Sequence, residues 1–111
     1  MVIGTTLYKL DGNPYYSPEF GRGGLAATFS VDVTHVTGSL VGFLISVETR
    51  NSEDTTWSSL GSFSAITAAT ADSKDLTGCK EIVRFVYLFD ASDASTAAVH
   101  FLMQAPSWRP Y

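Results

Sequence analysis

The stretch VGFLISVETRNSEDTTWSSLGSF, from Val41 to Phe63, decides the fold class of this 111-residue chain. Its first half alternates strictly, and one face of the expected strand carries only apolar residues: Val41, Phe43, Ile45 and Val47. A polar turn follows at residues 50–54, and the apolar pattern resumes at Trp57. A period of two with one apolar face predicts an antiparallel hairpin that buries that face. We expect Trp57 to be a core or corner residue, and the hairpin to carry almost no chemistry.

The rest of the chain repeats this pattern. Residues 26–36 and 97–104 alternate cleanly, whereas residues 81–89 are apolar on both faces and predict a central strand whose second face is covered. A bulge is expected near Gly61, and residues 72–78 are expected to form a polar loop. Turn signals recur about every ten residues. The sequence therefore predicts six to eight strands in an all-β antiparallel β-sandwich, jelly-roll or Ig-like.

Composition indicates one domain with a weakly charged surface. Charged residues make up 16% of the chain, below the roughly 25% of an average soluble domain, and Ser, Thr and Gly take their place. Such a surface fits one that is partly covered by partners, and equally a neutral β-protein surface. The net charge is −4 and the seven basic residues are scattered, which argues against nucleic-acid binding. No apolar run approaches the roughly 20 residues that span a bilayer.

The first 24 residues differ from the rest. The segment DGNPYYSPEFGRGG, residues 11–24, excludes a helix and a central strand because of its prolines and glycines. Its aromatic residues argue against a plain linker. We therefore expect an extended N-terminal arm over residues 1–24 and a β-sandwich domain over residues 25–111 that ends in the short tail APSWRPY. The arm packs either on its own sandwich or on a neighbouring subunit.

Aromatic residues and arginines concentrate in these two end segments. Tyr, Trp and Arg are the residue types enriched at interface hot spots. The sequence therefore predicts a partner interface formed by Tyr15, Tyr16, Phe20, Arg22, Trp108, Arg109 and Tyr111.

Catalytic and metal-binding patterns are not found in the sequence. His35 and His100 are far apart in the chain, and neither has a ligand-spaced Cys, His or carboxylate beside it. The turn at residues 90–95 lacks the glycine and terminal glutamate of a calcium loop. Cys79 has no histidine near it in sequence and is expected to be a structural or surface thiol. The carboxylate pairs lie in expected loops, at Glu53–Asp54 and Asp72/Asp75. We expect no catalytic residue, no metal and no cofactor, and hence no enzyme.

Four segments together carry a family resemblance: SPEFGRGGLAATFSVDVTHVTG, SVETRNSEDTTWSSLGSFSAIT, GCKEIVRFVYLF and VHFLMQAPSW. An acidic, cysteine-poor β-domain of this length with these segments resembles the small structural proteins of tailed bacteriophages, in particular head decoration (cement) and other minor virion proteins. The resemblance extends from about Ser17 to the end of the chain. Its motifs are structural, so it transfers no catalytic residue.

This resemblance implies a binding role on a virion. Cement proteins commonly form trimers at the local threefold axes of a capsid and bridge its subunits with extended arms. It implies the major capsid protein as partner, a homotrimer, and a place on the capsid surface after synthesis in the bacterial cytoplasm. The alternatives are a phage tail or neck component and a carbohydrate-binding β-sandwich module, which exposed aromatic residues on a flat sheet face would support.

Overall fold

The computed structural model describes residues 3–8, 14–93 and 96–110, and within these ranges all regular structure is β. The strands are β1 Ile3–Tyr8, β2 Tyr15–Tyr16, β3 Phe20–Gly21, β4 Ala26–Thr37, β5 Leu44–Arg50, β6 Ser58–Ser62, β7 Thr70–Thr77, β8 Ile82–Leu88, β9 Ala98–Met103 and β10 Ser107–Arg109. All named strand pairs are antiparallel. The predicted all-β antiparallel class is therefore confirmed.

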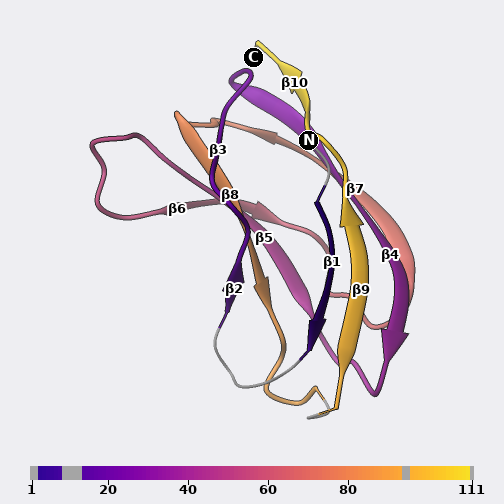
Figure 1. Ribbon diagram of the computed structural model, residues 1–111. Helices are drawn as coiled ribbons and strands as arrows, with labels where there is room; N and C mark the ends of the chain where they lie inside the picture. The colour runs from indigo at the N-terminus through magenta and orange to yellow at the C-terminus, as the bar shows by residue number, and fades with distance from the viewer. Residues whose placement is uncertain (1–2, 9–13, 94–95, 111) are drawn as a thin grey trace.

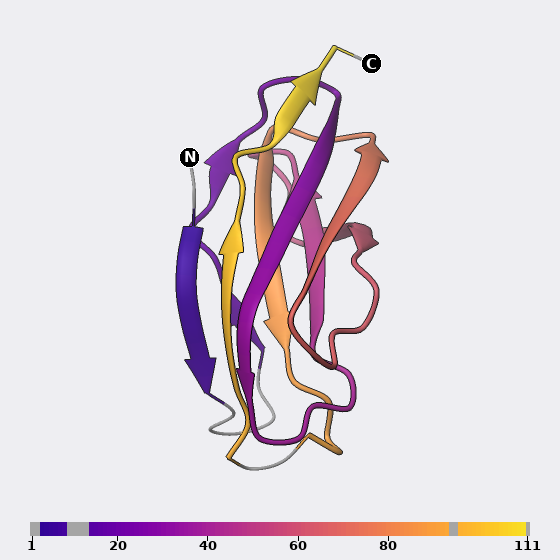
Figure 2. The ribbon, with the colours of Figure 1, turned by 90° about the vertical axis from the view of Figure 1, so that its right-hand side faces the viewer.

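The strands form two sheets that face each other. In sheet A the order is β1-β9-β4-β7 (Figure 2). The short strand β10 pairs with the first residues of β4, on the same edge of β4 that pairs with β9 later in the strand. In sheet B the order runs from β2 and β3, which share one edge of β8, through β8 and β5 to β6. Figure 1 views the two sheets from the side, with sheet B on the left and sheet A on the right.

The core lies between the sheets and comes from the inward positions of the alternating strands. Neighbouring strands in the middle of both sheets contribute fully buried phenylalanines and aliphatic residues, because every second side chain points to the same face. They include Phe29, Val31 and Val33 on β4, Ile45 and Val47 on β5, Val83 and Phe85 on β8, and Val99, Phe101 and Met103 on β9. These strands are the ones that the sequence pattern predicted most clearly.

The hairpin that decided the fold class is present, with two differences of detail. Val41 is 52% exposed, because the strand begins only at Leu44 and Val41 belongs to the connection from β4. The register between β5 and β6 shifts after Val47, which places the expected bulge beside Gly61. The hairpin projects from the body of the sandwich (Figure 1).

One prediction about another strand was wrong, and one was met only in part. Residues 72–78 were expected to form a loop, but β7 pairs with β4 along eight positions, from Thr70 to Thr77. A polar strand with charged residues is typical of a sheet edge, where one side needs no partner strand. β8 was expected to be central with its second face covered: it does lie between β5 and the pair β2 and β3, but that face is only partly covered, since its outward positions up to Val86 are half-buried and Leu88 is exposed.

A separate N-terminal arm is not confirmed by the described part of residues 1–24. β1 pairs with β9, and β2 and β3 pair with β8, so these segments complete an edge of each sheet. Proline is compatible with edge strands, and Pro18 lies in the break between β2 and β3. The tail predicted at the other end of the chain contains β10, which pairs with β4.

Candidate partner-binding surfaces

Two of the predicted interface residues, Phe20 and Trp108, meet at one end of the sandwich. Their ring centroids lie 6.5 Å apart, in an edge arrangement. Phe20 also packs on Phe85 at 5.4 Å, and Trp108 packs on Phe29 at 6.1 Å. A side chain at Gly23 would meet the Trp108 ring at 2.6 Å, so the chain passes close over it. Both residues are half-buried and close the end of the core.

The two predicted interface arginines lie at the same end, and both are hydrogen-bonded within the chain. Arg22 donates to the carbonyl of Cys79 at 2.7 Å. Arg109 donates to the hydroxyl of Thr28 at 2.9 Å and lies 3.5 Å from the carboxylate of Asp75. The hydrogen bond from Thr28 lowers the pKa of the exposed Asp75 carboxyl, and the Arg109 guanidinium lowers it further.

The two tyrosines of β2 point to opposite faces of sheet B. Tyr15 is half-buried and packs against the core. Tyr16 pairs with Val86 in the register and is 53% exposed on the outer face of the sheet. Tyr111 lies outside the described residues. The structure thus gathers four of the seven predicted residues at one end of the molecule (Phe20, Arg22, Trp108 and Arg109) and places Tyr16 elsewhere.

The outer face of sheet B carries a stack of arginine and aromatic side chains, which the sequence analysis missed. The guanidinium of Arg84 lies 4.1 Å from the ring centroid of Tyr16 and 4.1 Å from that of Trp57. Glu48 accepts from Arg84 at 2.9 Å and 2.8 Å. Arg50 lies 5.0 Å from the Trp57 ring. Trp57 is therefore half-buried on this face and does not belong to the core between the sheets; of the two places predicted for it, core or corner, the corner stays a prediction.

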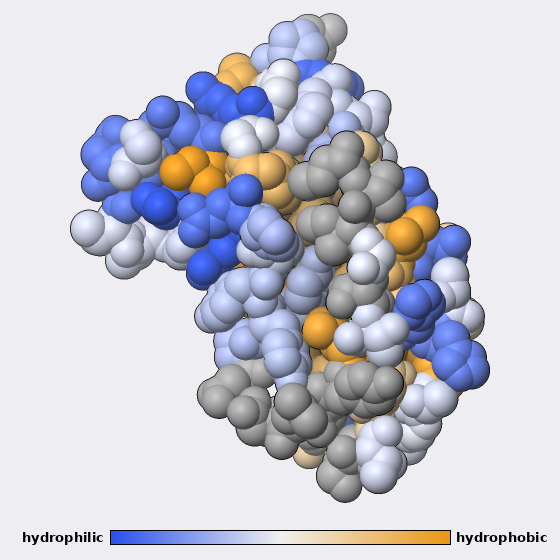
Figure 3. Space-filling view, in the orientation of Figure 1, coloured by the Kyte–Doolittle hydropathy of each residue, from blue (hydrophilic) through white to orange (hydrophobic). Residues whose placement is uncertain are grey.

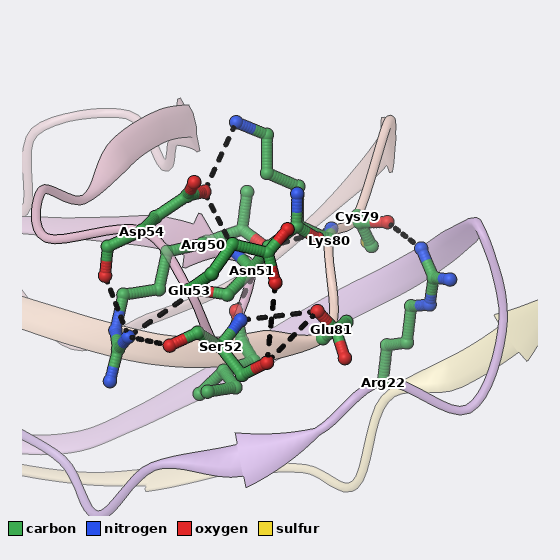
Figure 4. Close-up of polar contacts among 11 residues, drawn as sticks. Arg22, Arg50, Asn51, Ser52, Glu53, Asp54, Cys79, Lys80 and Glu81 are labelled. Carbon is green, nitrogen blue, oxygen red and sulfur yellow. Dashed lines mark hydrogen bonds and ion pairs between the residues drawn. The ribbon is translucent and has the colours of Figure 1, made fainter.

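A network of polar contacts fixes the tip of the projecting hairpin (Figure 4). Arg50 donates to three carbonyls of its own turn, those of Asn51 at 3.3 Å, Ser52 at 3.4 Å and Asp54 at 3.0 Å. The Asp54 carboxylate accepts from the Asn51 N–H at 2.9 Å. These hydrogen bonds satisfy backbone groups of the turn from within the turn itself.

The same tip is tied to the segment that leads into β8. Lys80 lies 3.9 Å from the carboxylate of Asp54. The backbone N–H and the hydroxyl of Ser52 donate to Glu81, at 3.1 Å and 3.3 Å. Figure 3 shows that the projecting hairpin is mostly hydrophilic, while apolar residues appear on this side only in small, separate patches. The hairpin is a polar projection that is held by contacts within its turn and with the segment before β8.

The described residues contain no group of three or more His, Cys, Asp or Glu side chains that could hold a metal. Burial raises the pKa of the Cys79 thiol, and the nearby Arg22 charge offsets only part of that rise, as expected for a structural thiol. Within the described ranges, no helix is long and apolar enough to span a membrane.

Comparisons of the chain with protein-family models, with curated proteins and with solved structures give no significant match.

Proposed function

We propose that this chain is a non-enzymatic virion structural protein, a decoration (cement) protein on the capsid of a tailed bacteriophage. The observation that carries this proposal is the order of its strand pairs: along the sequence, each pair lies between the two strands of the pair before it. β1 pairs with β9, β2 and β3 pair with β8, β4 pairs with β7, and β5 pairs with β6. Successive pairs alternate between sheet A and sheet B, as when one long hairpin is rolled into a sandwich.

This nesting supports a jelly roll. If β2 with β3 and β9 with β10 each count as one interrupted strand, the ten strands occupy eight positions, four in each sheet. An immunoglobulin-like sandwich instead keeps its first two strands in one sheet. Jelly rolls recur in viral capsid and lectin domains. A fold alone does not imply a function. We therefore choose the capsid role over the lectin role because the sequence resembles phage virion proteins.

The proposed contact with the major capsid protein lies at the end where β3 meets β10. Leu25 is 47% exposed there. It lines a shallow depression of about 340 Å³ together with Arg22, Gly23, Gly24 and Pro110. The exposed leucine offers apolar surface that a partner chain can cover, and the arginine beside it is a residue type enriched at interface hot spots. A homotrimer would present three such ends, and avidity would multiply their individual affinities.

A matched pair of variants tests this surface. Leu25→Asp places a charge in the proposed contact, whereas Leu88→Asp places one on an exposed leucine at the end of β8, away from that contact; the two side chains are 47% and 38% exposed. Both variants should fold, because neither side chain is buried. We expect only Leu25→Asp to lose cosedimentation with capsids of the encoding phage. Equal binding by both variants would contradict the proposed contact.

Electron microscopy of the decorated particle tests the role itself. A decoration protein should appear as threefold clusters on the capsid surface. Density in a ring at the neck or tail would instead identify a tail or neck component, and particles without bound protein would contradict a virion role.

One observation favours a carbohydrate-binding module as the second candidate. Tyr16 and Trp57 both lie on the outer face of sheet B, where lectin-like sandwiches can stack sugars. Each ring, however, already has the Arg84 guanidinium 4.1 Å from its centroid. A glycan array probed with wild type and Tyr16→Ala decides the matter: binding lost in the variant supports this candidate, and an array without hits removes it.

A further inference from the structure

The two histidines of the chain, 65 positions apart, stand side by side on the outer face of sheet A. His35 on β4 pairs in the register with His100 on β9, and Thr6 on β1 pairs with His100 from the other side. All three residues are exposed. Directly opposed side chains on neighbouring strands have their Cβ atoms about 5 Å apart. The register thus forms a row of two imidazoles and one hydroxyl.

A bulge in β4 is what brings the imidazoles together. The register shifts between Val33, which pairs with Phe101, and His35, which pairs with His100. In an unbroken ladder Thr34 would oppose His100, and His35 would oppose the fully buried Val99. The extra residue turns His35 outward.

Hydrogen bonds fix one of the two rings. The hydroxyl of Thr6 is bonded to Nδ1 of His100 at 2.5 Å, which leaves Nε2 as the available nitrogen. The hydroxyl of Thr34 donates to the His100 carbonyl at 3.2 Å. Within the described part of the chain, the His35 ring has no hydrogen bond or ion pair. One ring is therefore oriented and the other is free to turn towards it.

The surface beside this row is hollowed. Ala98 pairs with Thr37 in the next row of the sheet, and its small side chain leaves a depression of about 370 Å³. The depression is lined by Thr6, His35, Thr37, Ala98 and His100. A ligand of His35 and His100 would thus lie in a recess lined by hydroxyl groups.

We propose that His35 and His100 bind a late first-row divalent metal ion such as Zn²⁺ or Cu²⁺. Imidazole nitrogens suit these ions, and tetrahedral Zn–N bonds of about 2.0–2.1 Å place two ligand nitrogens about 3.3 Å apart, within reach of opposed histidines. A metal-bound histidine commonly has its other ring nitrogen bonded to a neighbouring group, the role that Thr6 fills for His100. With two protein ligands, water completes the coordination, and the site is open to solvent.

Calorimetric titration of the untagged protein with ZnCl₂ tests the proposal. We expect one saturable site per chain. A titration with CuCl₂ should show tighter binding, because Cu²⁺ exceeds Zn²⁺ in the Irving–Williams order of affinities. His35→Ala and His100→Ala should each weaken binding by about 10-fold or more. Thr6→Val removes only the orienting hydroxyl and should weaken binding by about 10-fold.

Glu53→Gln is the matched control, since it removes a charge from the exposed hairpin turn and leaves the histidines intact. It should bind as wild type does. Thermal melts of the metal-free variants check folding, and His35→Gln provides a polar replacement if His35→Ala melts early. Zn²⁺ should raise the Tm of wild type and not that of His35→Gln. Titration without a saturable site, or equal affinity in wild type and both histidine variants, would overturn the proposal.

Discussion

At the scale of single residues, the Tyr87 hydroxyl is the least satisfied polar group described in the core. It is buried without a hydrogen-bond partner among the described residues, while the nearby Ser17 hydroxyl is engaged by the Phe85 N–H and the Pro18 carbonyl. A buried hydroxyl without a partner is destabilising. We expect Tyr87→Phe to raise the free energy of unfolding by about 1 kcal/mol, measured by urea denaturation. A loss of stability would show that the hydroxyl is bonded after all.

The same hydroxyl makes stability depend on alkaline pH. Burial raises the pKa of the Tyr87 phenol well above its ordinary value of 10.0. The folded state then holds this proton more tightly than the unfolded state. The resulting contribution to the free energy of unfolding is fully present below the ordinary pKa and is lost as the pH rises towards the folded-state pKa. Tyr87→Phe should flatten the fall in stability above about pH 10. A residual slope from about pH 9 is expected from Cys79, whose pKa is also raised by burial.

Asp93 is the buried carboxylate that holds the loops at the other end of the sandwich. It is 4% exposed and accepts hydrogen bonds from the backbone N–H groups of Val41, Gly42 and Asp90. Asp93→Ala leaves these donors without that acceptor and should cost about 3 kcal/mol of unfolding free energy. Asp93→Asn keeps one acceptor oxygen and should cost less. Equal losses in the two variants, measured by denaturant titration, would contradict this assignment.

At the scale of elements, the stack on sheet B joins β2, β8 and the β5–β6 hairpin through one guanidinium. Arg84 combines two aromatic contacts with the Glu48 carboxylate, and its side chain is 18% exposed. A lysine keeps the positive charge but lacks the planar guanidinium, which can stack on aromatic rings and hydrogen-bond to a carboxylate at the same time. We expect Arg84→Lys to lower the free energy of unfolding by about 1 kcal/mol. A double-mutant cycle with Trp57→Ala should give a coupling energy clearly above zero, and additive losses would refute the stack.

Sequence periodicity predicted the inner strands well because their burial is asymmetric. β4 and β5 alternate between buried and outward residues, and this alternation is visible in the sequence whatever strands they pair with. β7 was missed because an edge strand rich in Asp, Ser and Thr looks like a loop. The opposite charges of Glu48 and Arg84 were readable on outward positions, but only the register between β5 and β8 makes them neighbours.

At the scale of the whole molecule, long-range pairing decides which predicted site residues meet. Phe20 and Trp108 are far apart in the sequence. Their rings pack together because β3 and β10 lie at the same end of the sandwich, one in each sheet. The pairing of His35 with His100 depends in addition on a bulge that shifts the register by one residue. Periodicity carries no information on either event, so the sequence could indicate candidate residues but not their grouping.

The same topology gives the N-terminal segment a structural task that a deletion can measure. β1 covers one edge of β9, and Leu7 packs against the core. Deleting residues 1–8 removes these contacts and exposes the edge of a strand whose inner residues are apolar. We expect the Tm to fall by roughly 10 °C or more, with self-association of the shortened chain.

The chain without the deletion and with Leu7→Ala is the control that separates lost packing from lost strand pairing. It keeps the β1–β9 ladder, so it should melt earlier than wild type without associating. If the deletion instead left the Tm unchanged and abolished only capsid binding, the first strand would be an arm for a neighbouring subunit and not part of this sandwich. Scanning calorimetry and size-exclusion chromatography of wild type and both variants distinguish these outcomes, because a strand that completes its own sheet cannot be removed without a loss of stability.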